Sequence, residues 1–141
     1  MILIDTTILV DVLRGSGTEN AERLVLLIGS EDMAFARFTE LEVLVGAKDE
    51  RDWDRLRTFF SKRTILDPQP DTWWKAARLY FDLRRNGRTL RSIADCCIAQ
   101  IALEHDLPLV HNDRDFEAMA EVVPLKLIRL KLRPPSGTMT R

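Results

Sequence analysis

Short apolar runs alternate along the chain with longer stretches in which apolar residues recur at helical spacing. The short runs predict strands at residues 2–4, 33–36, 64–66 and 107–111, and a last strand within residues 122–130. The longer stretches predict helices at residues 8–13, 19–28, 39–47, 52–60, 92–105 and 113–120. A further long helix is expected to be capped by Asp71 and to end at Asn86 and Gly87.

This alternation is typical of a parallel sheet that helices cover on both faces. The runs at residues 2–4 and 107–110 are apolar throughout, as expected of central strands. The predicted fold class is α/β, a three-layer α/β/α sandwich with a central parallel sheet. We expect one domain over residues 1–133 and a flexible C-terminal tail over residues 134–141, which is rich in Pro, Ser and Gly.

The composition is that of a soluble globular protein. Of the 141 residues 45% are hydrophobic and 30% are charged, and the net charge of −1 argues against a polycationic binder. No apolar run approaches the ~20 residues of a membrane-spanning helix. Cys96 and Cys97 are adjacent and are the only cysteines, which argues against a disulfide framework or a zinc site. We therefore expect a cytoplasmic protein.

Two acidic residues directly follow predicted strands. Asp5 follows the first strand, and Asp113 follows the strand that ends near His111. The carboxyl ends of parallel strands open at the same edge of a sheet, where ligands bind in such folds. Either carboxylate is also suited to cap the helix that follows it, and that simpler interpretation stays open for each.

Two more acidic residues precede or open apolar helices. Asp95 is the only charged residue from Ile93 to Leu103, and burying a lone carboxylate is costly unless something compensates its charge. The compensation is either a capping box with Ser92 or a bound cation. Glu42 has the same capping-box spacing from Thr39, with Glu40 as a rival acid on another side of the helix.

The four carboxylates together carry more weight than each alone. Clustered carboxylates repel one another and raise each other's pKa, and a divalent cation relieves that repulsion. Oxygen ligands without a Cys or His arrangement favour Mg²⁺ or Mn²⁺. Such ions support attack of water on a phosphodiester, a reaction that needs no histidine base. We therefore expect a surface or structural role for His111.

The four acidic residues lie in four blocks of sequence. The blocks are ILIDTT at residues 2–7, TELEVLVGA at 39–47, IADCCIA at 93–99 and NDRDF at 112–116. Together and in this order they resemble the PIN domain, and in particular its VapC-type ribonuclease toxins. The resemblance spans residues 2 to about 130.

The resemblance implies a Mg²⁺- or Mn²⁺-dependent endoribonuclease that cleaves RNA. It implies that the metal-binding and catalytic residues are Asp5, Glu42, Asp95 and Asp113, with Glu42 preferred to Glu40 because it precedes the Val-Leu-Val-Gly stretch. Thr6 and Asp115 would support these carboxylates. Family members are usually homodimers and are held inactive by a cognate antitoxin.

Two other classes remain as alternatives. The first is a catalytically inactive PIN-fold module that binds RNA or protein. The second is a phosphatase or receiver-like acid pocket, which the sequence disfavours because the first strand ends Asp-Thr-Thr rather than Asp-x-Asp.

Basic and aromatic residues cluster ahead of the helix that carries Asp95. Four arginines lie within eight residues, and they would contact RNA phosphates or form a solvated helix end: Arg84, Arg85, Arg88 and Arg91. Four aromatic residues precede them at helical spacing, which favours a core or dimer surface over base stacking: Trp73, Trp74, Tyr80 and Phe81.

Overall fold

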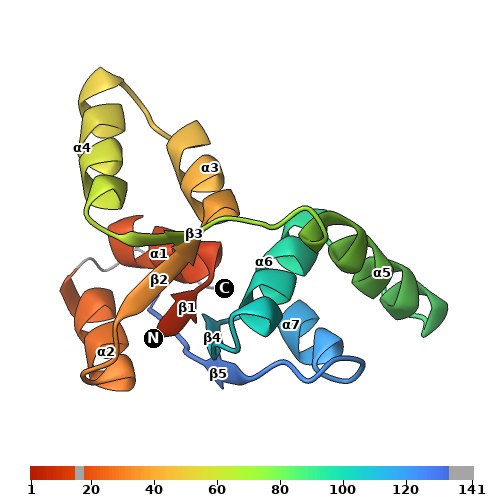
Figure 1. The fold of residues 1–141 in the computed structure, drawn as a ribbon. Helices are drawn as coiled ribbons and strands as arrows, with labels where there is room; N and C mark the ends of the chain where they lie inside the picture. Colours follow the sequence, from red (N-terminus) through yellow and green to blue (C-terminus); the bar gives the residue numbers. More distant parts are fainter. Residues whose placement is uncertain (15–17, 134–141) are drawn as a thin grey trace, which may run out of the picture.

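A five-stranded parallel sheet with helices on both faces forms the centre of the fold in a computed structural model, which describes residues 1–14 and 18–133 (Figure 1). The strands are β1 (Ile2–Ile4), β2 (Met33–Ala36), β3 (Thr64–Leu66), β4 (Leu109–His111) and β5 (Leu127–Arg129). The helices are α1 (Thr6–Arg14), α2 (Thr18–Ile28), α3 (Arg37–Val45), α4 (Glu50–Ser61), α5 (Thr72–Arg85), α6 (Ile93–Glu104) and α7 (Arg114–Met119). The expected tail at residues 134–141 lies outside the described residues.

The strand order is β3-β2-β1-β4-β5, and every neighbouring pair is parallel. The chain therefore winds outward from β1 to β3 and then crosses to the other side of β1 for β4 and β5. The register aligns Ile4 of β1 with Val110 of β4. The change of direction lies between β1 and β4, which is where ligands bind in open α/β sheets.

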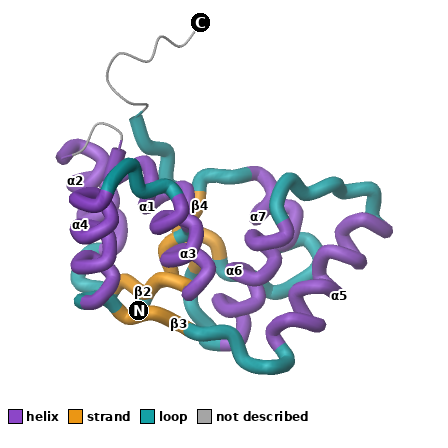
Figure 2. Tube along the Cα trace, turned by 90° about the horizontal axis from the view of Figure 1, so that it is seen from above, coloured by secondary structure: helices purple, strands orange, loops and turns teal. Residues whose placement is uncertain are grey.

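Two hydrophobic cores, one on each face of the sheet, hold the three layers together. Leu3 points into the core formed with α5, α6 and α7, whereas Ile2 and Ile4 point into the core formed with α1, α2, α3 and α4. Figure 2 shows α5, α6 and α7 on one side of the strands and α2 and α4 on the other. The predicted three-layer α/β/α fold class is confirmed.

Helix α6 is largely buried. Six of its residues are buried, namely Cys96, Cys97, Ile98, Ala99, Ile101 and Ala102. This burial agrees with the apolar sequence of the helix, and it leaves Asp95 in the first turn as its only charged residue before Glu104. None of the helices in the described residues is long and apolar enough to cross a membrane.

Two details of the predicted elements are wrong. Asp71 does not cap α5, since its own backbone is helical (φ −79°, ψ −16°) and its side chain makes no cap hydrogen bond. The hydroxyl of Thr72 instead accepts a hydrogen bond from Gln69 N at 2.8 Å. Strand β4 is shorter than predicted, because Pro108 lacks the backbone N–H that a strand ladder needs.

Asn20 fastens the end of the described chain to α2. Its fully buried side chain donates to Arg133 O at 3.0 Å and accepts from Arg133 N at 2.9 Å. The same amide nitrogen lies 3.4 Å from Asp11 O. The Asn20 side chain therefore pairs with both the backbone N–H and the backbone carbonyl of Arg133, in the segment that follows β5.

Asn20→Ala is expected to lower the free energy of unfolding by about 2 kcal/mol, because it removes two part-buried hydrogen bonds that join α2 to the backbone of Arg133. The melting temperature should fall by roughly 5–8 °C. Thermal unfolding followed by circular dichroism measures both quantities. The exposed neighbour Glu22 provides the control, and an equal loss in Glu22→Ala would contradict the explanation.

Candidate metal centre

Asp5 lies at the carboxyl end of the central strand β1 and is 2% exposed. Its backbone N donates to Val110 O at 3.0 Å, which continues the pairing of β1 with β4. One carboxylate oxygen, Oδ2, accepts from Thr7 N at 3.3 Å. The other oxygen, Oδ1, is buried and has no hydrogen-bond partner within the part of the chain that the structure describes. Such an atom is costly to bury unless a ligand meets it.

Three further carboxylates converge near Asp5. Asp95, Asp113 and Asp115 each offer one oxygen atom, and these atoms lie within 4.8 Å of one another. Asp95 comes from the first turn of α6, whereas Asp113 and Asp115 come from the start of α7, directly after β4. The neighbouring strands β1 and β4, together with helix α6 that precedes β4, thus bring together residues that lie far apart in the sequence.

Glu42 joins this group from α3. The hydroxyl of Thr6 donates to Glu42 Oε1 at 3.0 Å and shares a second hydrogen bond of 2.9 Å with the hydroxyl of Thr39. Glu40, two residues away, forms ion pairs with Arg37 and Arg57 instead. We call Asp5, Glu42, Asp95, Asp113 and Asp115 the acidic centre.

The acidic centre is electrostatically strained. Burial and, to a smaller extent, the charges of Glu42 and Asp113 raise the pKa of Asp5 to about 6, against the lowering effect of backbone hydrogen bonds. Burial and, to a smaller extent, the charges of Asp5, Asp113, Glu42 and Asp115 raise the pKa of Asp95 to about 7. Positive charge placed among these oxygens would relieve both effects.

The capping interpretations have different outcomes. Ser92 precedes α6 but makes no side-chain cap hydrogen bond, so the capping box proposed for Asp95 is incomplete. The capping box of Thr39 and Glu42 is wrong, because α3 begins at Arg37 and both residues lie inside the helix. Asp113 does cap α7, accepting from Asp115 N at 3.0 Å, and it belongs to the acidic cluster as well.

The four arginines occupy different positions. Arg91 contacts the acidic centre, where its Nη2 donates to both carboxylate oxygens of Asp113 at 3.1 and 3.2 Å. Arg88 pairs with Glu121 at 3.0 Å. Arg84 and Arg85 lie in the last turn of α5, over the rings of Tyr80 and Phe81 respectively. The helix-end interpretation therefore fits these last two arginines, and Arg91 is the one that reaches the candidate site.

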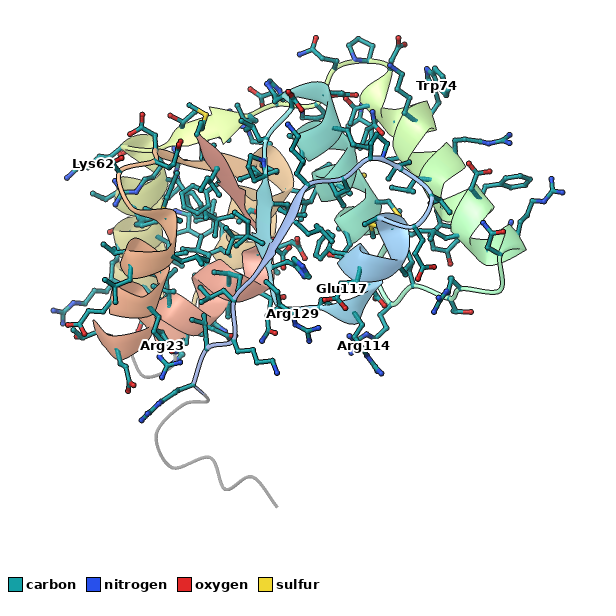
Figure 3. The ribbon with its side chains drawn as sticks, turned by 90° about the horizontal axis from the view of Figure 1, so that it is seen from below. Arg23, Lys62, Trp74, Arg114, Glu117 and Arg129 are labelled. Atoms are coloured by element: carbon teal, nitrogen blue, oxygen red, sulfur yellow. The ribbon has the colours of Figure 1, made fainter. Side chains whose placement is uncertain are left out.

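Of the core or dimer-surface role predicted for the aromatic residues, Trp73 and Trp74 do not fit the core, since they are 53% and 59% exposed. The dimer-surface alternative stays a prediction for them. Trp73 packs edge-on against Phe38, and Tyr80 is partly buried against the core. Phe81 is 37% exposed. These rings lie on the outer helix α5, whose amino-terminal half carries Trp74 at the edge of the molecule (Figure 3).

His111 is fully buried beside the site and fits the expected structural role. Its Nδ1 accepts from Asp113 N at 3.1 Å, and its ring packs edge-on against Phe116. Burial lowers the pKa of His111, which favours the neutral ring that this hydrogen bond requires. Cys96 is buried too, and burial raises the pKa of its thiol to about 12, so that it is not a reactive nucleophile.

The acidic centre fits a divalent cation. It offers only carboxylate oxygens, which hard cations such as Mg²⁺ and Mn²⁺ prefer. One of those oxygens, Asp5 Oδ1, is buried without a hydrogen-bond partner among the described residues. Three others come from a cluster compact enough to share one ion.

Sequence reasoning missed two features of this site and left a third open. Asp115 is predicted to support the carboxylates, with a role as a ligand left open, and its carboxylate lies in the compact cluster with Asp95 and Asp113. Thr39 is predicted to cap a helix, whereas its buried hydroxyl hydrogen-bonds with Thr6. The contact of Arg91 with Asp113 was not foreseen, and only the density of arginines ahead of Asp95 hinted at it.

Comparison with known proteins adds family relationships to this geometry. The PIN domain matches residues 2–122 of the chain. The chain is 33% identical over 129 residues to VapC ribonuclease Mb1587 of Mycobacterium bovis, a match that covers 89% of this chain and 96% of that one. It is 30% identical over 122 residues to ribonuclease VapC51 of Mycobacterium tuberculosis, covering 85% of each.

Solved structures with a similar fold include toxin–antitoxin complexes. A chain in the crystal structure of VapBC2 from Rickettsia felis, bound to a promoter DNA fragment, matches with a TM-score of 0.76 at 23% identity, covering 93% of this chain and all of that one. A chain of a toxin–antitoxin complex from Klebsiella pneumoniae matches with a TM-score of 0.70 at 23% identity, covering 91% and 96%. At these identities the likeness establishes the fold.

Asp95→Asn is expected to raise the melting temperature in EDTA, by about 2–5 °C at pH 8 and by less at pH 5. The pKa of Asp95 in the folded protein is raised from 3.8 to about 7, so the folded state binds this proton more tightly than the unfolded state does. Stability is therefore lost as the pH rises through this interval, and the neutral amide avoids that loss. Thermal unfolding at both pH values measures the effect.

The exposed residue Asp54 supplies the control, since Asp54→Asn removes a charge outside the acidic centre. A lower melting temperature for Asp95→Asn at pH 8 would contradict the repulsion argument. It would instead favour a stabilising role for Asp95 at the start of α6.

Proposed function

Because this chain belongs to the PIN domain family, we propose that it is a metal-dependent endoribonuclease that hydrolyses RNA phosphodiester bonds, and the toxin of a toxin–antitoxin pair. The observation that carries the proposal is the convergence of carboxylates at the carboxyl ends of β1 and β4, with a buried oxygen of Asp5 that lacks a partner among the described residues. The VapC relatives are named ribonucleases, which supports the same activity.

Asp5, Asp95 and Asp113 would hold Mg²⁺ or Mn²⁺, with Glu42 aiding that ion or a second one. Asp115 is a further candidate ligand, because its carboxylate lies in the same cluster. When bound, such an ion supplies a water of lowered pKa and positive charge near the scissile phosphate. Asp5 and Asp95 would be held ionised by it, since they ionise reluctantly in its absence.

The surrounding residues fix these ligands in place. Thr6 and Thr39 form a hydroxyl pair that orients Glu42 from the start of α1. The backbone N–H of Asp115 donates to the Asp113 carboxylate and orients it. His111 stabilises the same turn, because its Nδ1 accepts a hydrogen bond from Asp113 N. These contacts pre-organise the carboxylates, which spares the cost of ordering them when RNA binds.

The arginines ahead of α6 supply the positive charge that an acidic site needs to attract RNA. Arg91 lies at the acidic centre and Arg88 lies three residues before it. Guanidinium groups bind phosphates through paired hydrogen bonds. We assign RNA backbone contact to Arg88 and Arg91, and a weaker, longer-range attraction to Arg84 and Arg85 at the end of α5.

Exposed apolar side chains on α3 and α5 suit protein partners. Leu41 and Val45 are 57% and 76% exposed, and a groove of about 390 Å³ is lined by residues that include Phe38, Leu41 and Trp73. Exposed apolar patches of this kind mark interaction surfaces. We assign this face to contacts with a second copy of the chain and with a cognate antitoxin, a partner that the VapBC complexes support.

The purified chain with Mn²⁺ or Mg²⁺ is expected to cleave a mixture of ribosomal, transfer and messenger RNA. EDTA should stop the reaction, and Asp5→Asn should slow it at least about 100-fold because it removes a ligand oxygen from the centre. Glu42→Gln should slow it at least about 10-fold. Gel analysis of end-labelled RNA measures the rates.

The adjacent acid gives a matched control for this experiment. Glu40 pairs with Arg37 and Arg57 outside the acidic centre, so Glu40→Gln should keep the rate within about twofold. Cleavage that persists in EDTA or in Asp5→Asn would contradict the proposal. A folded protein that binds Mn²⁺ but cleaves none of these RNAs would favour the inactive binding module.

Expression of the chain in a bacterial host is expected to arrest growth through its RNA cleavage, whereas expression of Asp5→Asn should not. Co-expression of the protein encoded next to its gene should restore growth if that protein is the antitoxin. Colony counts after induction measure both effects. Arrest by the Asp5→Asn chain would show that toxicity does not come from the acidic centre.

A further inference from the structure

Arg91 reaches across the solvent side of the acidic centre. Its Nη2 contacts both carboxylate oxygens of Asp113, at 3.1 and 3.2 Å, and its Nε lies 3.8 Å from Asp115 Oδ2. The Arg91 side chain is 76% exposed, whereas those of Asp113 and Asp115 are only 19% and 17% exposed. A solvent-exposed cation thus contacts two largely buried anions.

These two carboxylates belong to the compact cluster that Asp95 completes. Asp113 has few free positions, since Oδ1 also accepts from Asp115 N at 3.0 Å. A divalent cation that uses Asp113 must therefore share it with the guanidinium or replace it. The two positive charges would also repel each other at this short range.

The segment that carries Arg91 has other anchors. Leu90 is buried in the core beneath it, and Arg88 pairs with Glu121 beyond the end of α7. The backbone N of Arg91 lies 3.4 Å from Asp115 Oδ2. The guanidinium can therefore leave Asp113 while the backbone stays in place, and an ion pair this exposed is exchanged at little cost.

We propose that Arg91 is a built-in counter-ion that competes with the divalent cation for Asp113 and Asp115 and, once displaced, binds an RNA phosphate. The inference rests on the proposed function and extends it to the order of events at the same site. The guanidinium fork suits a carboxylate and a phosphate equally well, so one side chain can serve both anions in turn. Arg91 would then link metal loading to RNA capture.

The competition predicts that Arg91→Gln binds Mn²⁺ more tightly than the parent chain, by about 3- to 10-fold in Kd. Isothermal titration of the full chain with MnCl₂ measures this directly, without RNA. Arg88→Gln removes an arginine of the same segment that pairs with Glu121, and its Kd should change less than about twofold. An equal or weaker affinity of Arg91→Gln would overturn the competition.

A second control separates a local effect from a change of net charge. Lys62 follows α4 and lies on the far side of the molecule from Arg114, the first residue of α7 (Figure 3). Lys62→Gln should leave Mn²⁺ affinity unchanged, because the ionic atmosphere screens distant charges. A gain equal to that of Arg91→Gln would overturn the assignment to Arg91.

The release step predicts the opposite sign for RNA. In a Glu42→Gln background, which keeps all four aspartates, Arg91→Gln should bind a labelled 12-nucleotide single-stranded RNA more weakly in saturating Mn²⁺, by about 3- to 10-fold. The slope of log affinity against log salt should fall by about 0.7, the value for one lost phosphate contact. Fluorescence anisotropy measures both, and Lys62→Gln again serves as control.

A purely structural role for Arg91 would weaken the binding of both metal and RNA. Unchanged RNA affinity and salt slope in Arg91→Gln would overturn the release step. Tighter Mn²⁺ binding by Arg91→Gln in a chain that cleaves no RNA would uphold the competition while contradicting the proposed function. Equal Mn²⁺ binding in a chain that cleaves RNA would contradict the competition alone.

Discussion

Repulsion among carboxylates at one edge of the sheet is the constraint on which the rest of the structure depends. Asp5 and Asp95 keep raised pKa values because burial and their acidic neighbours oppose ionisation. A small fold tolerates this repulsion only if the surrounding structure holds the acidic side chains in place against it. The apolar strands β1 and β4 and the apolar residues of the buried helix α6 provide that rigidity from outside the acidic centre. Asp113, a member of the centre, adds to it by capping α7.

Much of the fold was predictable because its signals are local. Apolar runs without alternation mark the buried central strands, and the alternation of strands with helices leaves few topologies other than a parallel sheet. Boundaries were less predictable. Helix α3 begins at Arg37, before the predicted start at Thr39. Thr39 is a residue type that often caps helices, but its hydroxyl packs inside the molecule against Thr6. That contact joins residues 33 positions apart, and no local pattern encodes it.

The candidate site was predictable to the extent that its residues break local expectations. Asp95 stood out because a lone acid in an apolar helix needs compensation, and Asp5 stood out because it ends an apolar strand. Asp115 and Arg91 carried no such signal, since acids and arginines are common at helix starts and in loops. Their roles depend on how the α5–α6 segment lies against α7, which is decided by long-range packing of Leu90 and by the pair of Arg88 with Glu121.

Asp113 both caps α7 and belongs to the acidic cluster. This double role affects the choice of a low-activity variant for crystallography. Replacing Asp113 would disturb the side-chain cap that holds the turn presenting Asp115, so a protein of low activity obtained that way would also be a distorted one. Glu42 is exposed and is held by a single hydroxyl. It is the better position for a slowed variant whose complexes still show the native surface.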